Sequence, residues 1–205
     1  MKRKINGGVM GEYIFKDSVY DELVIQSAIK NRRIILNEEV TEQSMQKLRL
    51  LLLKIKKIDD IQGIEHGKRK PIEIVISSYG GSIYECLGTI GLIEQFKNEY
   101  KYKIITICST KAMSCGALLL CTGSERKVYK YATILIHKLS SALWGNYDQM
   151  NIGHEEHVRL QNLLEKIIVD NTNIPMELLK EKTFALDWYI SPEECLKYGI
   201  ATEII

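Results

Sequence analysis

Short runs of branched apolar residues alternate with helical patterns through the middle of the chain, and this alternation restricts the fold more than any other feature. Residues 72–76 and 103–107 are predicted strands, because they are rich in isoleucine and are bounded by polar or turn residues. Between them, apolar residues recur at helical spacing from Ile83 to Ile93. Strands that alternate with helices form parallel sheets with crossover connections. We therefore expect an α/β fold.

Further elements are predicted on both sides of this region. A buried strand is expected at residues 32–36, followed by a helix that Thr41 caps. Residues 59–70 are polar and contain two glycines, so we expect a surface loop there. The other predicted elements are strands at residues 127–131, 133–136 and 200–205, a long helix at 147–170, and a last helix that begins at a Ser191 capping box and ends at Gly199.

Length, cysteine content and charge narrow the classes of protein to which the chain can belong. The 205 residues suffice for one domain with a sizeable core, and no linker-like segment interrupts them. The five cysteines form no CxxC pair, which favours reduced thiols and a cytoplasmic location. No apolar run approaches the roughly 18–20 residues of a membrane-spanning helix. The net charge of +2, with no aromatic residues among the basic patches, indicates no nucleic-acid partner.

A cluster of small residues around Ser114 is the strongest chemical signal in the sequence. Ala112, Gly116 and Ala117 flank the serine, and an apolar helix is predicted to begin there. Small neighbours allow a substrate carbonyl to approach, and the N–H groups at a helix N-terminus can stabilise an oxyanion. From the residue types alone, the alternative that Ser114 only caps the helix stays open.

A serine hydroxyl needs a base to become a nucleophile, and His137 is the candidate base. It follows the predicted strand at residues 133–136, whereas the other three histidines lie in polar surroundings. The alternative is a core histidine without a catalytic role. His154 and His157 have the spacing of two ligands on one helix, but no third ligand is evident, so we expect no metal site.

Two further positions extend this candidate hydrolase site. Gly80 and Gly81 join a predicted strand to a predicted helix, where they form either a simple turn or a place of close approach for a peptide backbone. They lack the pattern of a phosphate-binding loop. Asp187 lies between apolar residues, and a buried carboxylate there would need a partner such as a histidine N–H.

Several segments together resemble ClpP, the self-compartmentalising serine peptidase. Residues 77–82, Ser-Ser-Tyr-Gly-Gly-Ser, are similar to the family's Asn-Ser-Pro-Gly-Gly-Ser, and residues 112–117, Ala-Met-Ser-Cys-Gly-Ala, are similar to its Ala-Ala-Ser-Met-Gly-Ala. Ile136 and His137 match its Ile-His. Residues 187–199 resemble its Asp-Arg-Phe-Leu-Ser followed by Tyr-Gly. The motifs occur in the family's order along most of the chain.

The resemblance implies a ClpP/crotonase-like α/β fold of repeated ββα units, in a single domain at residues 1–205. A flexible segment is expected at residues 1–16, and a protruding strand-helix handle at residues 138–170. Members of the family form seven-membered rings that stack in pairs and enclose the active sites. An AAA+ unfoldase supplies them with unfolded protein chains. The peptidase itself needs no cofactor, and no membrane partner is implied.

The resemblance also assigns a role to individual residues. Ser114 would be the nucleophile of a serine endopeptidase, His137 the base and Asp187 the residue that orients the base. The backbone N–H groups of Gly81 and Cys115 would form the oxyanion hole. The residues implied in substrate binding are Gly80, Ser82, Ile83, Leu139 and Ser140.

The sequence departs from the family pattern at several of these segments. Tyr79 replaces a proline before the two glycines, and Lys138 replaces Gln-Pro after the histidine. Residues 139–146 have lost most of the expected glycines, and Ala185-Leu186 replace an acidic-arginine pair that couples rings. Alternatives are therefore a single ring or otherwise altered assembly, a phage-type head or scaffold maturation protease of the same family, and a catalytically silent ring subunit.

Two other enzyme classes remain as alternatives. One is a Ser-Lys peptidase with Lys111 or Lys138 as the base, although a strand would direct Lys138 away from His137. The other is a crotonase-fold acyl-CoA enzyme, which shares the fold and an oxyanion hole. That class does not explain why Ser114, His137 and Asp187 occur together in this order.

Overall fold

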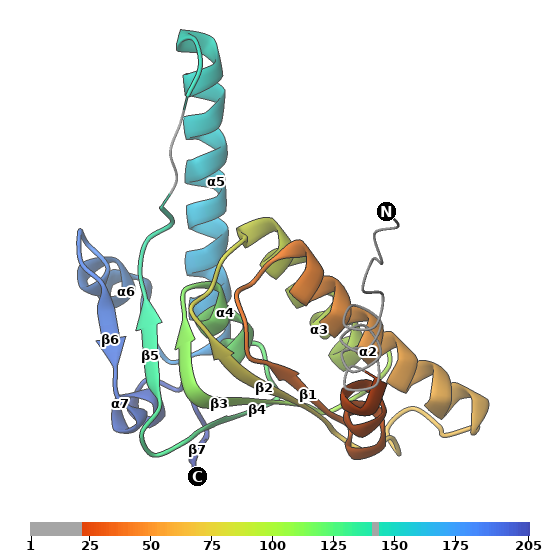
Figure 1. Cartoon of the computed structure of the whole chain (residues 1–205). Coiled ribbons are helices and arrows are strands. Elements are labelled where there is room, and N and C mark those ends of the chain that lie inside the picture. The colour runs from red at the N-terminus through yellow and green to blue at the C-terminus, as the bar shows by residue number, and fades with distance from the viewer. Residues whose placement is uncertain (1–21, 141–143) are drawn as a thin grey trace, which may run out of the picture.

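A computed structural model describes residues 22–140 and 144–205 of the chain, and within them a seven-stranded sheet forms the centre of the fold (Figure 1). The flexible segment expected at residues 1–16 lies outside the described residues, as do residues 141–143 of the expected handle. Five strands pair in parallel in the spatial order β1 (Arg33–Leu36), β2 (Ile72–Ser78), β3 (Ile104–Met113), β4 (Glu125–Val128) and β7 (Glu203–Ile204). The predicted α/β class is confirmed.

Strand β3 is longer than predicted, and its two halves have different neighbours. Residues 105–108 pair with β4, whereas residues 111–113 pair in parallel with β5 (Thr133–Ile136). β5 pairs in turn, antiparallel, with β6 (Trp188–Ile190). The carboxyl ends of β3 and β5 therefore meet at one edge of the sheet. Ser114 and His137 directly follow these ends, so the topology brings the two residues together.

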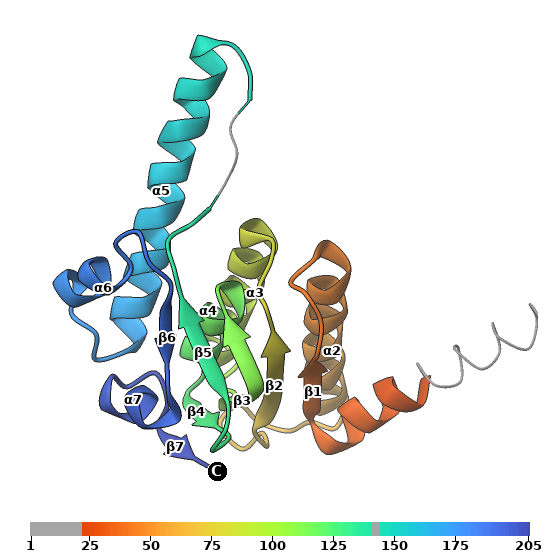
Figure 2. The ribbon, with the colours of Figure 1, turned by 60° about the vertical axis from the view of Figure 1, so that its left-hand side comes forward.

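Three helices cover one face of the sheet: α2 (Glu42–Ile61), α3 (Ile83–Asn98) and α4 (Cys115–Cys121) (Figure 2). The main hydrophobic cluster lies between these helices and the strands. Every residue of α4 is buried, as its all-round apolar character predicted, and all but Gly116 belong to the cluster. A helix at residues 22–31 precedes β1. Among the described residues, the opposite face of the sheet carries no helix (Figure 2).

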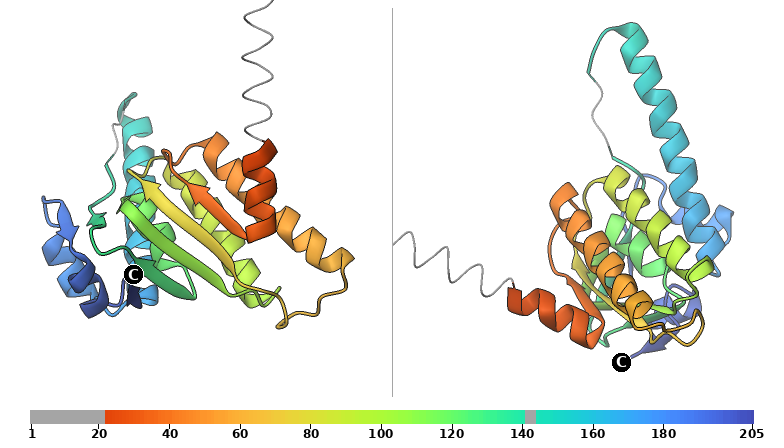
Figure 3. Two further views of the ribbon diagram at one scale, coloured as in Figure 1. Left: turned by 60° about the horizontal axis from the view of Figure 1, so that its bottom comes forward. Right: turned by 90° about the vertical axis from the view of Figure 1, so that its right-hand side faces the viewer.

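The long helix α5 (Tyr147–Asn171) projects away from the sheet, as Figures 1 and 3 show. This projection agrees with the predicted handle. The chain returns through α6 (Met176–Lys182) and β6 to α7 (Pro192–Lys197), which packs near β5. Within residues 22–140 and 144–205, no helix combines the length and apolar character that crossing a membrane requires.

Capping signals read from the sequence are confirmed at two helices. The Thr41 hydroxyl accepts a hydrogen bond from the Ser44 N–H, and the Ser44 hydroxyl accepts one from the Thr41 N–H, so a capping box begins α2. Ser191 and Glu194 form the same arrangement at α7. Gly199 follows α7 with φ 68°, which is the left-handed conformation expected of a C-terminal cap.

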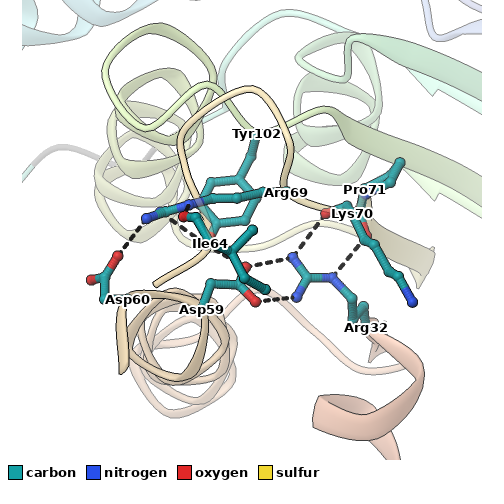
Figure 4. Close-up of polar contacts among 8 residues, drawn as sticks. All are labelled: Arg32, Asp59, Asp60, Ile64, Arg69, Lys70, Pro71 and Tyr102. Carbon is teal, nitrogen blue, oxygen red and sulfur yellow. Dashed lines mark hydrogen bonds and ion pairs between the residues drawn. The ribbon is translucent and has the colours of Figure 1, made fainter. Parts of the chain in front are cut away.

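The prediction of an exposed loop at residues 59–70 is only partly right. Helix α2 continues to Ile61, and Asp59 and Arg69 are buried because both contact residues far away in the sequence (Figure 4). Arg32 binds the Asp59 carboxylate through two hydrogen bonds of 2.9 and 3.0 Å, and the Tyr102 hydroxyl donates to the same carboxylate at 2.7 Å. Arg69 donates to the Tyr102 hydroxyl at 3.1 Å. The network ties this loop to β1 and to the start of β3.

Candidate active site

Ser114 occupies the sharp turn between β3 and α4. Its backbone angles are φ 51° and ψ −121°, a positive-φ conformation that residues with a side chain rarely adopt. The Ser114 N–H donates to the Leu135 carbonyl at 2.9 Å, and the Ser114 carbonyl accepts from the Ala117 N–H at 2.9 Å. One bond fixes the serine to β5 and the other to α4. The side chain is half-buried at the N-terminus of that helix.

The turn formed by Gly80 and Gly81 packs directly against the serine. A Cβ atom on Gly80 would lie 2.7 Å from the Ser114 Cβ, so no larger residue fits there. Gly81 has φ 142°, and a Cβ on it would collide with the Val40 carbonyl oxygen. The Val40 N–H donates to Gly80, and the Ser82 N–H donates to Val40, both at 2.7 Å. Within the described residues, this pairing leaves the Gly81 N–H without a backbone acceptor.

Two thiols connect the Gly80–Gly81 turn with the start of α4. The Cys115 thiol donates to the Gly81 carbonyl at 3.2 Å, and the Cys86 thiol of α3 donates to the Cys115 carbonyl at 3.5 Å. The two thiols also interact with each other: the Cys86 side chain lowers the pKa of the Cys115 thiol, and the same contact together with burial raises the pKa of Cys86. Cys115 begins α4, so its N–H has no acceptor within the helix. No sequence pattern indicates this contact of Cys86, whose apolar surroundings predict only a core thiol.

Ser114 and His137 line the same cavity, which has a volume of about 80 Å³. Of the residues predicted to bind substrate, Ile83, Leu139 and Ser140 also line it, whereas Gly80 and Ser82 do not. The two residues predicted for the oxyanion hole, Gly81 and Cys115, border it as well. The rest of the lining is apolar and consists of Ala117, Leu118, Ile136, Leu164 and Ile168.

The chain that follows His137 is held against α5 by side chains that the sequence did not single out. The Leu139 N–H donates to Gln161 Oε1 at 2.8 Å, and Gln161 Nε2 donates to Glu165 at 2.8 Å. Glu165 is 5% exposed. No sequence pattern could indicate these contacts, because Gln161 lies 22 residues from Leu139. These bonds fix the position of Leu139, which lines the same cavity as His137.

The structure places Asp187 near His137, but in a different environment from the one expected. The two residues line a second cavity of about 480 Å³ that adjoins the first at His137. Asp187 is exposed, so the expectation of a buried carboxylate is wrong. The loop before β6 turns outward at Ala185, which has φ 56°, and this loop also exposes Phe184 and Leu186.

The three candidate catalytic residues therefore line two adjoining cavities, but no hydrogen bonds connect them in the described part of the chain. Among the described residues, no hydrogen bond connects the Ser114 hydroxyl with His137 or His137 with Asp187. The lysines of the Ser-Lys alternative are directed elsewhere. Lys111 lies over the Tyr79 ring and Lys138 over the Phe184 ring, and neither lines the cavity that holds the serine. The Ser-Lys alternative thus has no geometric support.

No metal-binding arrangement is found in the part of the chain that the structure describes. Within residues 22–140 and 144–205, no three His, Cys, Asp or Glu side chains are placed to hold a metal ion together. The cavity lining includes the groups that acyl transfer uses: the Ser114 hydroxyl, the His137 imidazole and the backbone N–H donors of Gly81 and Cys115.

Comparisons with known proteins agree with this chemistry. A sequence model of Clp proteases matches residues 16–205. The chain is 30% identical over 178 residues to the ATP-dependent Clp protease proteolytic subunit 1 of Prochlorococcus marinus (strain NATL2A), covering 86% of this chain and 84% of that protein. It is 28% identical over 179 residues to the protein of the same name from Synechococcus sp. (strain CC9902), with the same shares covered.

These matches extend over the whole described fold, which is the crotonase-like fold of Clp proteases. They also cover the segments that carry Ser114, His137 and Asp187. The chain therefore belongs to the Clp protease family, and its activity is that of a serine peptidase.

Proposed function

We propose that this peptidase cleaves unfolded protein chains with Ser114 as nucleophile, His137 as general base and Asp187 as the residue that orients the base. The placement of Ser114 is the observation that carries the proposal. It sits in a strained turn at a helix N-terminus and lines one cavity together with His137. Strained backbone of this kind is maintained where the surrounding structure requires it, as at a nucleophile.

The chemistry follows from the groups around the cavity. His137 would accept the proton of the Ser114 hydroxyl as the oxygen attacks the peptide carbonyl, and would return it to the leaving amine. The oxyanion would accept hydrogen bonds from the N–H groups of Gly81 and Cys115. Water would then hydrolyse the acyl-enzyme by the same proton path in reverse. Fixed N–H donors of this type contribute roughly 10²–10³ in rate.

The substrate would lie across the cavity as an added β-strand. On one side it would pair with the backbone of residues 80–83, and on the other with Leu139 and Ser140. The apolar lining and the volume of about 80 Å³ suit one aliphatic side chain of moderate size at the residue before the scissile bond.

The missing hydrogen bonds of the triad fit an enzyme whose site tightens on binding. Catalytic hydrogen bonds are often long in free enzymes and shorten in the complex with substrate. The exposed loop that carries Asp187 can approach His137 without disturbing the core, because Phe184 and Leu186 beside it are themselves exposed. Contact with a neighbouring subunit or with substrate would stabilise the conformation in which Asp187 bonds to His137.

Partners form a further part of the proposal. Membership of the Clp protease family implies self-association and association with a Clp ATPase. The proposed form is a single-domain chain, residues 1–205, in a heptameric ring, with an AAA+ unfoldase that supplies substrates and with no cofactor in the peptidase. The five cysteines are free and buried, which supports a reducing compartment such as the cytoplasm.

A catalytically silent ring subunit is the second candidate, and one observation favours it. Asp187 is exposed and makes no hydrogen bond to His137 among the described residues. A permanent gap at this point would leave the imidazole without an orienting partner.

Hydrolysis of an internally quenched peptide with one leucine, and of unfolded casein, tests the proposal. The purified chain should cleave both with Ser114→Ala as the inactive control, and mass spectrometry should map the peptide cut after leucine. The oligomeric state is measured on the same samples by mass photometry. A correctly assembled ring that cleaves neither substrate, with or without a Clp ATPase, would support the silent subunit instead.

A further inference from the structure

Lys111 and Tyr79 form a pair beside the nucleophile that the proposed mechanism does not use. The Lys111 Nζ atom lies 4.3 Å from the centroid of the Tyr79 ring, which is within the range of a cation–π contact. Tyr79 is 70% exposed and Lys111 is half-buried. Within the described residues, no carboxylate forms an ion pair with Lys111. Its positive charge is therefore held in place and is not neutralised.

Both members of the pair are close to the reacting groups along the chain. Tyr79 directly precedes Gly80, the residue whose backbone packs against Ser114. Lys111 lies three positions before Ser114 on β3 and pairs in register with Thr133 of β5. Because the next residue, Ala112, is fully buried in the core, Lys111 is on the face of the sheet away from the helices.

The apolar cavity and Lys111 are thus on opposite faces of the sheet. Residues of α4 and α5, among them Leu118 and Leu164, line the cavity on the helix side. A substrate bound as a strand directs successive side chains to opposite faces. When one side chain occupies the cavity, an adjacent side chain is directed to the face that carries Lys111.

We propose that Lys111, positioned by the Tyr79 ring, is a specificity-determining residue that favours a Glu or Asp side chain in the substrate, adjacent to the residue that fills the apolar cavity. This inference rests on the proposed function. A charge pair at a partly solvated site strengthens binding about two- to fivefold, and salt weakens it. The effect should fall on KM more than on kcat, because the substrate carboxylate is bound equally in the ground and transition states.

Quenched peptides that differ at single positions test this inference. The parent carries one leucine with glutamine on both sides, and glutamate replaces one glutamine or the other. For the wild type, one glutamate peptide should have a kcat/KM about two- to fivefold above that of the parent, and the ratio should approach one at 1 M salt. Lys111→Gln should abolish the difference, while Lys111→Arg should keep it.

Lys130→Gln is the matched control variant. Lys130 lies over the exposed Tyr131 ring, with Nζ 5.4 Å from the centroid, but it belongs to the loop that contacts the C-terminal residue Ile205. This variant should retain the preference for glutamate. Equal rates for all three peptides with the wild type would overturn the inference and leave the proposed function intact. A Lys111→Gln variant that keeps the preference would also overturn it. If the wild type cleaves no peptide, both proposals fail.

Discussion

The backbone of Ser114 gives the clearest test at the scale of single residues. A non-glycine residue at φ 51° and ψ −121° carries a strain on the order of 1–3 kcal/mol. Ser114→Gly should relieve this strain, whereas Ser114→Ala should keep it. We expect both variants to be inactive, with the glycine variant more stable by about 1 kcal/mol in urea unfolding, after the entropy cost of glycine is subtracted. Equal stability of the two variants would mean that the strain is no larger than the entropy cost of glycine, about 0.5–1 kcal/mol, and would contradict the expected gain.

Asp187 tests the catalytic assignment at a residue that contributes little to folding. Its side chain is exposed and makes no hydrogen bond among the described residues, so Asp187→Asn should change the free energy of unfolding by no more than about 0.5 kcal/mol. If its carboxylate orients His137 during the reaction, the same change should lower kcat by about 10⁴. A variant with near-native turnover would rule out this role. A substitution that unfolds the protein would show that the exposed placement is wrong.

At the scale of elements, the network around Asp59 in Figure 4 holds the segment after α2 to the sheet. Asp59 is 2% exposed and binds both Arg32 and Tyr102. Asp59→Ala should cost about 2–3 kcal/mol in the free energy of unfolding, because the half-buried Arg32 guanidinium and the Tyr102 hydroxyl lose their charged hydrogen-bond partner. Glu65→Ala is the matched control, since its ion pair with Lys68 is largely exposed and contributes at most about 1 kcal/mol. Similar losses for the two variants would contradict this account of the network.

The polar cluster around Glu156 on the projecting helix α5, which also contacts α3, should depend on pH. The Tyr84 hydroxyl donates to Glu156 at 3.1 Å, and Arg159 also binds that carboxylate. The hydrogen bond from Arg159 lowers the pKa of Glu156 from 4.5 to about 2. A lowered folded-state pKa means that the stabilisation is complete above pH 4.5 and is lost as the pH falls towards 2.

Thermal unfolding of Glu156→Gln against wild type measures this dependence. The difference in Tm should be constant from about pH 5 to pH 8 and should shrink below pH 4.5. Glu155→Gln, at an exposed neighbouring position, is the control and should show no such trend. A difference that persists unchanged at pH 2 would contradict the assignment.

Local signals in the sequence predicted most elements but not all of them. Residues adjacent in the sequence encode the Ser191 capping box, the apolar strands and the all-round apolar helix after Ser114. The structure contains each of these features. Helix α6 begins at Met176, its N-cap residue Pro175 offers no side-chain cap, and it buries only Leu179, so its pattern is too weak to recognise. Strand β6 has three residues and depends on pairing with β5.

At the scale of the whole molecule, the site depends on contacts that are distant in the sequence. Ser114 could be proposed as nucleophile from the small residues around it, and His137 as base from the apolar strand before it, but their shared cavity requires the pairing of β3 with β5. The burial of Asp59 and Arg69 depends on Arg32 and Tyr102, and a single sequence does not reveal such pairs. The exposed position of Asp187 is set by the turn at Ala185, which the sequence did not indicate either.

The whole-molecule fold also leaves apolar surface exposed away from the active site. Leu50 and Leu53 of α2, together with Ile25, border a groove of about 670 Å³ on the outer face of the molecule. Trp144 and Tyr147 near the tip of the projecting helix are 84% and 74% exposed. Two such areas on one chain are consistent with the self-association implied by the family.

Reaction with a serine-specific fluorophosphonate probe tests the central claim most directly, because an ordinary serine hydroxyl is inert to it. The assembled protein is incubated with the probe, and the adduct is located by peptide mass spectrometry, with Ser114→Ala as the control. An activated nucleophile predicts one adduct per chain at Ser114 and none in the control. Folded, assembled wild-type protein that remains unlabelled, alone and with a Clp ATPase, would contradict the assignment of Ser114 and His137 as a working catalytic pair.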